Sequence, residues 1–340
     1  MAARDIEYVE LYTSDKHEAI DYLVSSLGFA KIAESVNFTM SSTLLRQGDV
    51  QLVVTAGPAT AEFLDKHGDG VADIAFSCDD VSATCAAVVA EGGVVLDSAD
   101  GNPVVPGFGS VCHTLLPARM DGDAWIPPGR RWTAVPGEPR RSAERITGLD
   151  HIAICLEAGC LAGCTDFYRA AFALDWYSSE FIEVADQAMD SIVLRSRSGG
   201  ITFTILEPDT SRNPGQLDSF LDQNNGAGVQ HLAFLTDAIV TAVGEFRRQG
   251  VKFLDTPDAY YDLLRERCPE ICEEIAELRS ADVLADRDEC GYLLQLFTRS
   301  PYERNTLFYE LIQRRGARGF GSANIRALYE AVERDRVIVG

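Results

Sequence analysis

Apolar and polar residues alternate over short stretches of the chain, and this pattern predicts β-strands that each bury one face. Residues 6–12 form the first such stretch. A helix is expected after it, beginning at the capping residue Asp15 and ending at Gly28. Residues 30–32, 38–45 and 50–55 then predict three short strands. The chain therefore opens with a βαβββ unit.

A glycine-rich turn followed by an alternating strand occurs twice. The copies are residues 68–76, Gly-Asp-Gly-Val-Ala-Asp-Ile-Ala-Phe, and residues 226–234, Gly-Ala-Gly-Val-Gln-His-Leu-Ala-Phe. Residues 149–154 also repeat the pattern of the opening strand. Turn, strand and following helix coincide in order, which favours four βαβββ units in two pairs over a chance likeness of short strands.

Histidines occupy repeated positions only in the second half. His231 stands where the first copy has Asp73, and His151 stands where the opening strand has Tyr8. The pattern predicts a duplicated fold in which one half keeps a histidine site and the other has lost it.

A change of composition divides the chain. Residues 120–145 are rich in Pro, Gly, Arg and Trp, which is typical of a linker. We expect an α+β fold of duplicated βαβββ modules in two domains, each an open barrel-like sheet with outer helices. The expected parts are an N-terminal domain over residues 1–120, a linker over 121–146 and a catalytic domain over 147–340. Within the last, residues 322–336 predict an amphipathic helix that closes over a site as a lid.

The amino-acid composition argues against several classes of binding partner. The 340 residues are 46% hydrophobic and carry a net charge of -22, which argues against binding to nucleic acid or to anionic membranes. No run of 18 apolar residues and no signal-like segment is seen, so we expect a cytoplasmic protein acting on a small molecule. The nine cysteines contain no Cys-x-x-Cys pair, which argues against a zinc knuckle and a disulfide framework.

Three residues form the candidate metal site. The repeat places His151 and His231 on one sheet, and Glu310 is an isolated acid within the apolar strand Leu-Phe-Tyr-Glu-Leu-Ile. A buried carboxylate is costly unless it is paired or binds a metal. Two histidines and one carboxylate on neighbouring strands fit non-haem Fe(II), because they leave positions open for dioxygen and a chelating substrate. The alternatives are histidines that serve only as hydrogen-bonded polar residues and an ion pair between Glu310 and Arg314.

The motifs around these residues resemble a known family. They are Leu-Asp-His-Ile-Ala at His151, Gly-Val-Gln-His-Leu-Ala at His231, Leu-Phe-Tyr-Glu-Leu-Ile-Gln-Arg at Glu310, and the tail Gly-Phe-Gly-Ser-Ala-Asn-Ile-Arg. Together they are similar to the 4-hydroxyphenylpyruvate dioxygenases and 4-hydroxymandelate synthases of the vicinal oxygen chelate superfamily. The resemblance covers nearly the whole chain and implies that His151, His231 and Glu310 are Fe(II) ligands.

The resemblance also implies the reaction and the pocket. An arylpyruvate, 4-hydroxyphenylpyruvate, would be oxidatively decarboxylated with O2 and then hydroxylated, either on the benzylic carbon to give 4-hydroxymandelate or on the ring to give homogentisate. The family's pocket positions fall on Ser191, Gln216, Gln230, Gln295, Phe297, Phe308 and Phe320. Gln295 lies between two leucines, so a purely structural hydrogen bond is the alternative for it.

Three pocket positions depart from the ring-hydroxylating pattern. Thr204 and Leu206 stand where ring hydroxylases have the proline and asparagine of Pro-x-Asn-Glu-Pro, and Ile325 stands for a phenylalanine of the lid. All three resemble the 4-hydroxymandelate synthases, which makes benzylic hydroxylation the leading interpretation and homogentisate formation the alternative. The synthase likeness would imply a role in making hydroxyphenylglycine for peptide natural products, including antibiotics.

The sequence argues against two other classes of protein. A metal-free binding protein on the same fold would need no intact three-ligand set. An extradiol ring-cleaving enzyme would want a further histidine beside the metal, and the other histidines, His17, His67 and His113, all lie in the first half. The fold family suggests a homodimer.

Overall fold

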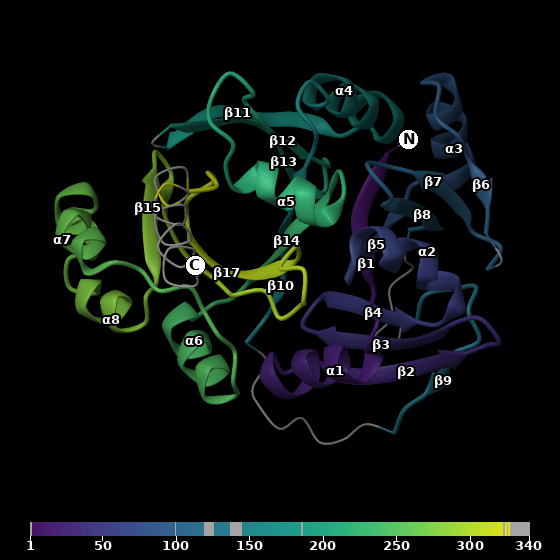
Figure 1. Ribbon diagram of the computed structural model, residues 1–340, viewed down its shortest axis with the longest axis horizontal. Coiled ribbons are helices and arrows are strands. Elements are labelled where there is room, and N and C mark those ends of the chain that lie inside the picture. The colour runs from purple at the N-terminus through teal and green to yellow at the C-terminus, as the bar shows by residue number, and fades with distance from the viewer. Residues whose placement is uncertain are drawn as a thin grey trace.

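Two curled mixed sheets lie side by side in the computed structural model, one in each half of the chain (Figure 1). The structure describes residues 2–98, 100–118, 126–136, 145–184 and 186–321, together with Asn324 and Arg326. The expected α+β fold of duplicated βαβββ modules is confirmed.

The first sheet has nine strands, in the order β6 (Leu96–Asp97), β7 (Pro103–Pro106), β8 (Cys112–Pro117), β5 (Gly70–Cys78), β1 (Ala3–Tyr12), β4 (Val50–Ala56), β3 (Ser41–Gln47), β2 (Ala30–Val36) and β9 (Thr133–Ala134). The second has eight, in the order β11 (Asp175–Val184), β12 (Gln187–Arg195), β13 (Thr202–Pro208), β10 (Gly148–Cys155), β14 (Gly228–Leu235), β17 (Phe308–Arg315), β16 (Gly291–Phe297) and β15 (Leu284–Asp288).

The α-helices pack on these sheets. They are α1 (Lys16–Asp21), α2 (Ala61–His67), α3 (Val81–Ala90), α4 (Leu161–Phe172), α5 (Gln216–Asn224), α6 (Ile239–Arg248), α7 (Asp258–Arg267) and α8 (Ile275–Ser280). Figure 1 shows α5 against the concave side of the second sheet, where it contacts β10, β13 and β14. The remaining helices of the second half lie outside that curl. A cavity of about 500 Å³ lies on this concave side, between α5 and the strands.

The pairing of the strands shows the duplication. In each half a central antiparallel pair, β1 with β5 or β10 with β14, is flanked on both sides by parallel neighbours. His231 faces Ala153 across its pair, and Asp73 faces Glu10 across the equivalent pair. The repeat seen in the sequence is therefore a repeat of strand register, which keeps equivalent residues on equivalent faces.

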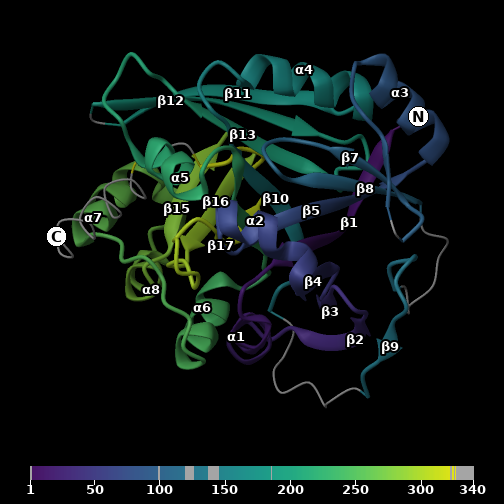
Figure 2. The ribbon, with the colours of Figure 1, turned by 45° about the vertical axis from the view of Figure 1, so that its right-hand side comes forward.

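Both halves share one hydrophobic core. Helices α3 and α4, one from each half, lie side by side in both views (Figure 2). Phe29 of the first half packs against Phe234 of the second with ring centroids 5.8 Å apart. The buried His113 Nε2 lies 2.5 Å from the Tyr168 hydroxyl across the same boundary. The sheet that carries the histidines is therefore supported from outside by the other half.

Several elements differ from the sequence expectation. Helix α1 ends at Asp21 and continues as a π-helical turn over Tyr22–Ser26. Strand β11 and helix α5 were not expected. Part of the expected linker, Thr133–Ala134, forms β9 and pairs with β2. The expected lid helix over residues 322–336 lies outside the described residues except for Asn324 and Arg326.

Two absences concern the described part of the chain. None of its helices has the length and apolar character needed to cross a membrane. All nine cysteines lie within it, and each is free.

Candidate metal centre and pocket

Three adjacent strands bring the candidate ligands together. His151 on β10 pairs with Ala233 on β14, and Ala233 pairs with Glu310 on β17. His231 is two residues before Ala233 and so shares its face of the sheet. The small Ala233 side chain leaves room between the neighbouring ligands. Strand register therefore produces the cluster, from residues that are up to 159 positions apart in the sequence.

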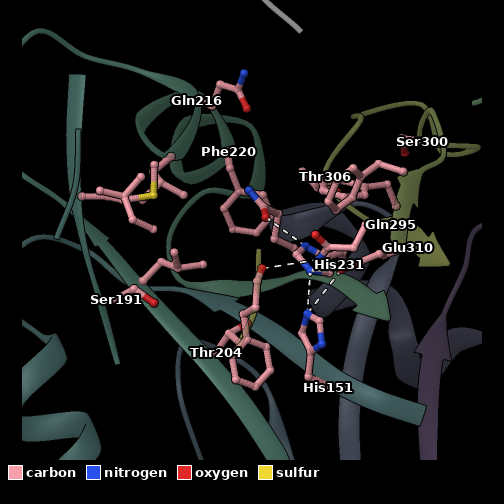
Figure 3. A pocket seen from close by; sticks show the side chains of 18 of the residues that line it. His151, Ser191, Thr204, Gln216, Phe220, His231, Gln295, Ser300, Thr306 and Glu310 are labelled. Atoms are coloured by element: carbon pink, nitrogen blue, oxygen red, sulfur yellow. Dashed lines mark hydrogen bonds and ion pairs between the residues drawn. The ribbon is translucent and has the colours of Figure 1, made fainter. Parts of the chain in front are cut away.

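The ligand atoms converge on one point (Figure 3). Glu310 Oε2 lies 3.3 Å from His151 Nε2 and 3.2 Å from His231 Nε2. The two Nε2 atoms are 3.3 Å apart. Adjacent ligands held about 2.1 Å from a metal ion lie about 3 Å from one another, so the spacing fits a metal centre. All three residues are buried, and together they could hold a metal ion.

Each histidine is oriented by a partner at its other nitrogen. His151 Nδ1 lies 2.8 Å from Asp150 Oδ2, and His231 Nδ1 lies 3.1 Å from Gln230 Oε1. Because both partners are acceptors, each ring carries a hydrogen on Nδ1 and turns Nε2 toward Glu310.

Asp150 is itself held by a cation. Arg314 donates from Nε to Asp150 Oδ1 at 2.6 Å and from Nη2 to Oδ2 at 2.8 Å. Arg314 also donates to the carbonyls of Ala317 and Gly319 and lies over the Phe320 ring. The sequence alternative in which Arg314 pairs with Glu310 is therefore not the arrangement found.

Burial and charge act in opposite directions on the ligands. Burial lowers the pKa of His151, but the charge of Glu310 and the hydrogen bond to Asp150 raise it to about 9. Burial dominates at His231 and lowers its pKa. Burial favours a neutral Glu310, yet the two histidines outweigh it and lower the pKa of that carboxyl. The metal-free centre thus holds an ionised carboxylate, which a divalent cation would neutralise.

A cavity of about 500 Å³ opens beside the three ligands. Figure 3 shows Ser191 and Thr204 on one side of it and Ser300 and Thr306 on the opposite side. Near the ligands its wall is aromatic: Phe308 stacks on the His231 ring at 5.0 Å, and Phe320 meets the His151 ring edge-on at 5.3 Å. This is a pocket of the size and apolar character that binds a small aromatic molecule.

The structure brings the expected pocket residues together. Those that line the cavity are Ser191, Thr204, Leu206, Gln216, Gln230, Gln295, Phe297, Phe308 and Phe320. Ile325 lies outside the described residues. Gln295 lies at the wall but donates to Glu310 Oε1 at 2.7 Å.

Several lining residues were not anticipated. They come from β11, β12, α5 and the turn before β17, and include Ser178, Glu180, Ile182, Met189, Val193, Phe220, Gln223, Ser300, Asn305 and Thr306. Strand β12 places Met189, Ser191 and Val193 on one face, because alternate residues of a strand share a face. The expected Ser191 could therefore have predicted the residues two positions before and after it as pocket residues. Sequence reasoning also missed Asp150 as the partner of His151 and Arg314 as the partner of Asp150.

The equivalent place in the first half holds a different cluster. By register, Tyr8, Asp73 and Thr114 correspond to His151, His231 and Glu310. Asp73 Oδ2 accepts from the Thr114 hydroxyl at 2.7 Å, and Tyr8 also hydrogen-bonds to this carboxyl.

An arginine is paired with the buried Glu10 carboxylate beside the first-half cluster. Arg130 donates two hydrogen bonds, of 2.8 and 2.7 Å, to the buried Glu10 carboxylate. A cation already occupies this place, and the residues equivalent to the histidines are not histidines. The first half therefore lacks the donor set of the second.

Comparison with known families agrees with the two-part fold. Residues 1–116 match the family described as hydroxyphenylpyruvate dioxygenase, HPPD, N-terminal. Residues 148–296 match the glyoxalase/bleomycin resistance protein/dioxygenase superfamily.

Individual relatives match over almost the whole chain. A 4-hydroxyphenylpyruvate dioxygenase of Yarrowia lipolytica is 30% identical over 370 residues, covering 98% of this chain and 92% of the relative. One of Neurospora crassa is 33% identical over 296 residues, covering 81% and 71%. Among solved structures, a triple mutant of 4-hydroxymandelate synthase from Streptomyces coelicolor is 49% identical, with a TM-score of 0.90 over 99% of this chain and 100% of the other.

Proposed function

Because the chain belongs to the family of the 4-hydroxyphenylpyruvate dioxygenases and 4-hydroxymandelate synthases, which are non-haem iron dioxygenases, we propose that it is a 4-hydroxymandelate synthase. The proposed reaction converts 4-hydroxyphenylpyruvate and O2 to 4-hydroxymandelate and CO2 by oxidative decarboxylation followed by benzylic hydroxylation. One oxygen atom enters the carboxylate of the product and the other becomes the benzylic hydroxyl. The observation that carries the proposal is the convergence of two histidines and one carboxylate at the wall of an aromatic-lined cavity.

His151, His231 and Glu310 are the proposed Fe(II) ligands. Two neutral imidazoles and a carboxylate are the donor set that suits Fe(II) with positions left open. When bound, the iron would hold the 2-oxo acid and activate dioxygen. Because the Nδ1 atoms are already hydrogen-bonded, the Nε2 atoms are the ring nitrogens that would bind the ion.

The pocket side chains have separate proposed roles. Phe297, Phe308 and Phe320 form the wall nearest the ligands and would pack against the substrate ring. Ser191, Gln216 and Gln230 supply polar atoms that would orient its phenol and carboxylate. A lid over residues 322–336, which contains Ile325, belongs to the same proposal.

Two pocket residues favour benzylic over ring hydroxylation. Thr204 and Leu206 both line the cavity, where ring hydroxylases carry proline and asparagine. Leu206 offers no hydrogen bond to the ring, so the side chain of the substrate rather than the ring would be presented for hydroxylation. The greater identity to the synthase structure, 49% against about 30% for the dioxygenases, supports the same choice. Homogentisate formation is the alternative, because the relatives with 30–33% identity carry that activity in their names.

Product identification tests the proposal. Protein loaded with Fe(II) under argon is exposed to air with 4-hydroxyphenylpyruvate, and the two isomeric products are separated by chromatography. Hydroxymandelate is expected. Homogentisate would keep the dioxygenase and overturn the synthase, and the absence of oxygen uptake by iron-loaded protein would favour a binding protein.

A pocket variant tests the cause of the regiochemistry. Leu206→Asn/Ile325→Phe should yield a measurable fraction of homogentisate, and Thr204→Pro can be added to it. The proline is best tested second, because β13 is a central strand and proline there removes a ladder hydrogen bond. Unchanged hydroxymandelate from a folded variant would show that these residues do not direct the hydroxylation.

The proposal also includes the oligomeric state, the domain boundaries and the cellular location. We expect a cytoplasmic homodimer with domains over residues 1–120 and 147–340 joined by the 121–146 linker, and light scattering on the purified protein tests the dimer. The acidic net charge of -22 is consistent with a protein that binds neither nucleic acid nor anionic membranes.

A further inference from the structure

A chain of hydrogen bonds leads from Glu310 to helix α7. Gln295 Nε2 donates to Glu310 Oε1 at 2.7 Å, and Asn324 Nδ2 donates to Gln295 Oε1 at 2.9 Å. The Tyr260 hydroxyl lies 2.8 Å from Asn324 Oδ1 and accepts from the backbone N–H of Ala285 at 2.8 Å. All four side chains in the chain are at least nine-tenths buried.

The direction of this chain is fixed from the metal side. The ionised Glu310 carboxylate only accepts, so Gln295 must present its amide nitrogen to Glu310 and its oxygen to Asn324. Asn324 must then present nitrogen to Gln295 and oxygen to Tyr260. Asn324 Oδ1 then needs a donor, and the Tyr260 hydroxyl proton supplies it, with the carbonyl of Ala285 at 2.7 Å as the second acceptor for the same proton. The amide of Ala285 occupies an acceptor site of the hydroxyl oxygen.

The two carboxylate oxygens of Glu310 therefore have different partners. Oε1 is capped by Gln295, whereas Oε2 lies 3.2–3.3 Å from both histidine Nε2 atoms. Gln295 also donates a weaker hydrogen bond, of 3.4 Å, to the carbonyl of Phe320. At Gly321, with φ +74°, a Cβ would overlap Gln295 Oε1, so the backbone approaches the amide closely there. Both N–H groups of the Gln295 amide are thus directed to protein acceptors, and its oxygen accepts from Asn324.

We propose that Tyr260 and Asn324 are positioning residues that act through Gln295 to keep Glu310 a one-oxygen ligand of the metal. This inference rests on the proposed iron site. Three protein atoms leave three positions of an octahedral ion. A 2-oxo acid that chelates takes two, and one remains for dioxygen. A Glu310 that swung both oxygens onto the ion would fill that last position.

Two neighbouring tyrosines give a matched pair of variants. Tyr260→Phe removes the donor that ends the chain, whereas Tyr261→Phe removes a buried hydroxyl that binds the carbonyl of Val283 at 3.1 Å, outside the chain. Both substitutions act on the same helix and the same 283–285 segment. Asn324→Asp is a third variant, because it places an acceptor against Gln295 Oε1 and reverses the required direction.

Nitric oxide reports the open position without turnover. Each protein is loaded with Fe(II) and 4-hydroxyphenylpyruvate under argon and titrated with nitric oxide, and the high-spin iron–nitrosyl signal is followed by electron paramagnetic resonance. Tyr260→Phe should weaken nitric oxide binding roughly tenfold, since one buried hydrogen bond contributes on the order of that factor. Asn324→Asp should weaken it at least as much, and Tyr261→Phe should match the wild type.

The outcomes separate this inference from the proposed function. Equal nitric oxide binding by wild type, Tyr260→Phe and Asn324→Asp would overturn the inference and leave the iron site intact. Equal losses in both tyrosine variants would also overturn it, because they would indicate a general effect on folding near residues 283–285. A wild type that binds no Fe(II), or a His231→Ala variant that binds it equally well, would overturn the proposed iron site and the inference with it.

Discussion

Asp150 offers a sharp test of how the metal ligands are held. Its side chain is 9% exposed and receives three donors, two from Arg314 and one from His151 Nδ1. Burial favours its neutral form, but the hydrogen bonds from Arg314 and His151 lower the pKa of Asp150 well below the ordinary value. It is therefore a carboxylate at every working pH. Asp150→Asn removes its negative charge and replaces one acceptor oxygen with an NH2 donor.

The asparagine cannot satisfy both neighbours. If its oxygen faces His151, its NH2 group faces the donors of Arg314. If its oxygen faces Arg314, its NH2 group faces His151 Nδ1, which favours the tautomer with hydrogen on Nε2 and blocks the atom that should bind the metal. Partners of this kind typically contribute 10- to 100-fold to metal affinity, which corresponds to about 1.4–2.7 kcal/mol. We expect Asp150→Asn to reduce the metal affinity by a factor within that range.

Metal affinity is measured by titrating metal-free protein with Co(II) or Fe(II) under argon, with circular dichroism as the check on folding. Asp166→Asn is the matched control, because it makes the same change in an exposed ion pair with Arg169. A folded Asp150→Asn protein with wild-type affinity would refute the reasoning. Asp150 would then serve only to neutralise Arg314.

Two further predictions concern stability. Burial and the nearby charge of Glu10 raise the pKa of Asp73 to about 7, while hydrogen bonds from Thr114 and Tyr8 act in the opposite direction. The folded state therefore binds this proton more tightly than the unfolded state, and the resulting stabilisation is complete below about pH 4 and lost as the pH rises through about 7. Asp73→Asn should accordingly gain stability relative to wild type between pH 5 and pH 8, by up to about 4 kcal/mol, and a difference in urea unfolding that does not change with pH would contradict this. The second prediction is that Fe(II) at 100 times its Kd stabilises the metal-free protein by about 2.7 kcal/mol, so that Tm rises by several degrees. Chelation should reverse the rise and His231→Ala should abolish it, whereas an equal rise in that variant would place the bound metal elsewhere.

The sequence was sufficient to predict the fold class and the cluster of three candidate ligands, because both follow from strand register. A period of two and a repeated turn place His151 and His231 on one face, and the isolated acid Glu310 identifies a third strand of the same sheet. Strand β11 was missed because most of its side chains are partly or fully exposed, which leaves no alternation to detect. Helix α5 was missed because it is short and polar, although Leu217 and Phe220 share its buried face.

The partners of the ligands could not be predicted in the same way. Arg314, Asn324 and Tyr260 reach the centre through side-chain orientation and through segments that register does not control. Arg314 even appeared in the sequence as a candidate partner of Glu310, four residues away, and the structure places it on Asp150 instead. Strand register determines which face of the sheet a side chain lies on. It does not determine which hydrogen-bond partner that side chain binds.

The first half shows what the same register does without histidines. The face that carries the candidate metal ligands in the second half must in the first half also bury polar groups, because strand pairing directs Tyr8, Asp73 and Thr114 inward. These groups satisfy one another, and the Arg130 guanidinium neutralises the neighbouring Glu10 carboxylate. A buried carboxylate thus has a cationic partner in each half, an arginine in the first and, in the proposed holoenzyme, an iron ion in the second.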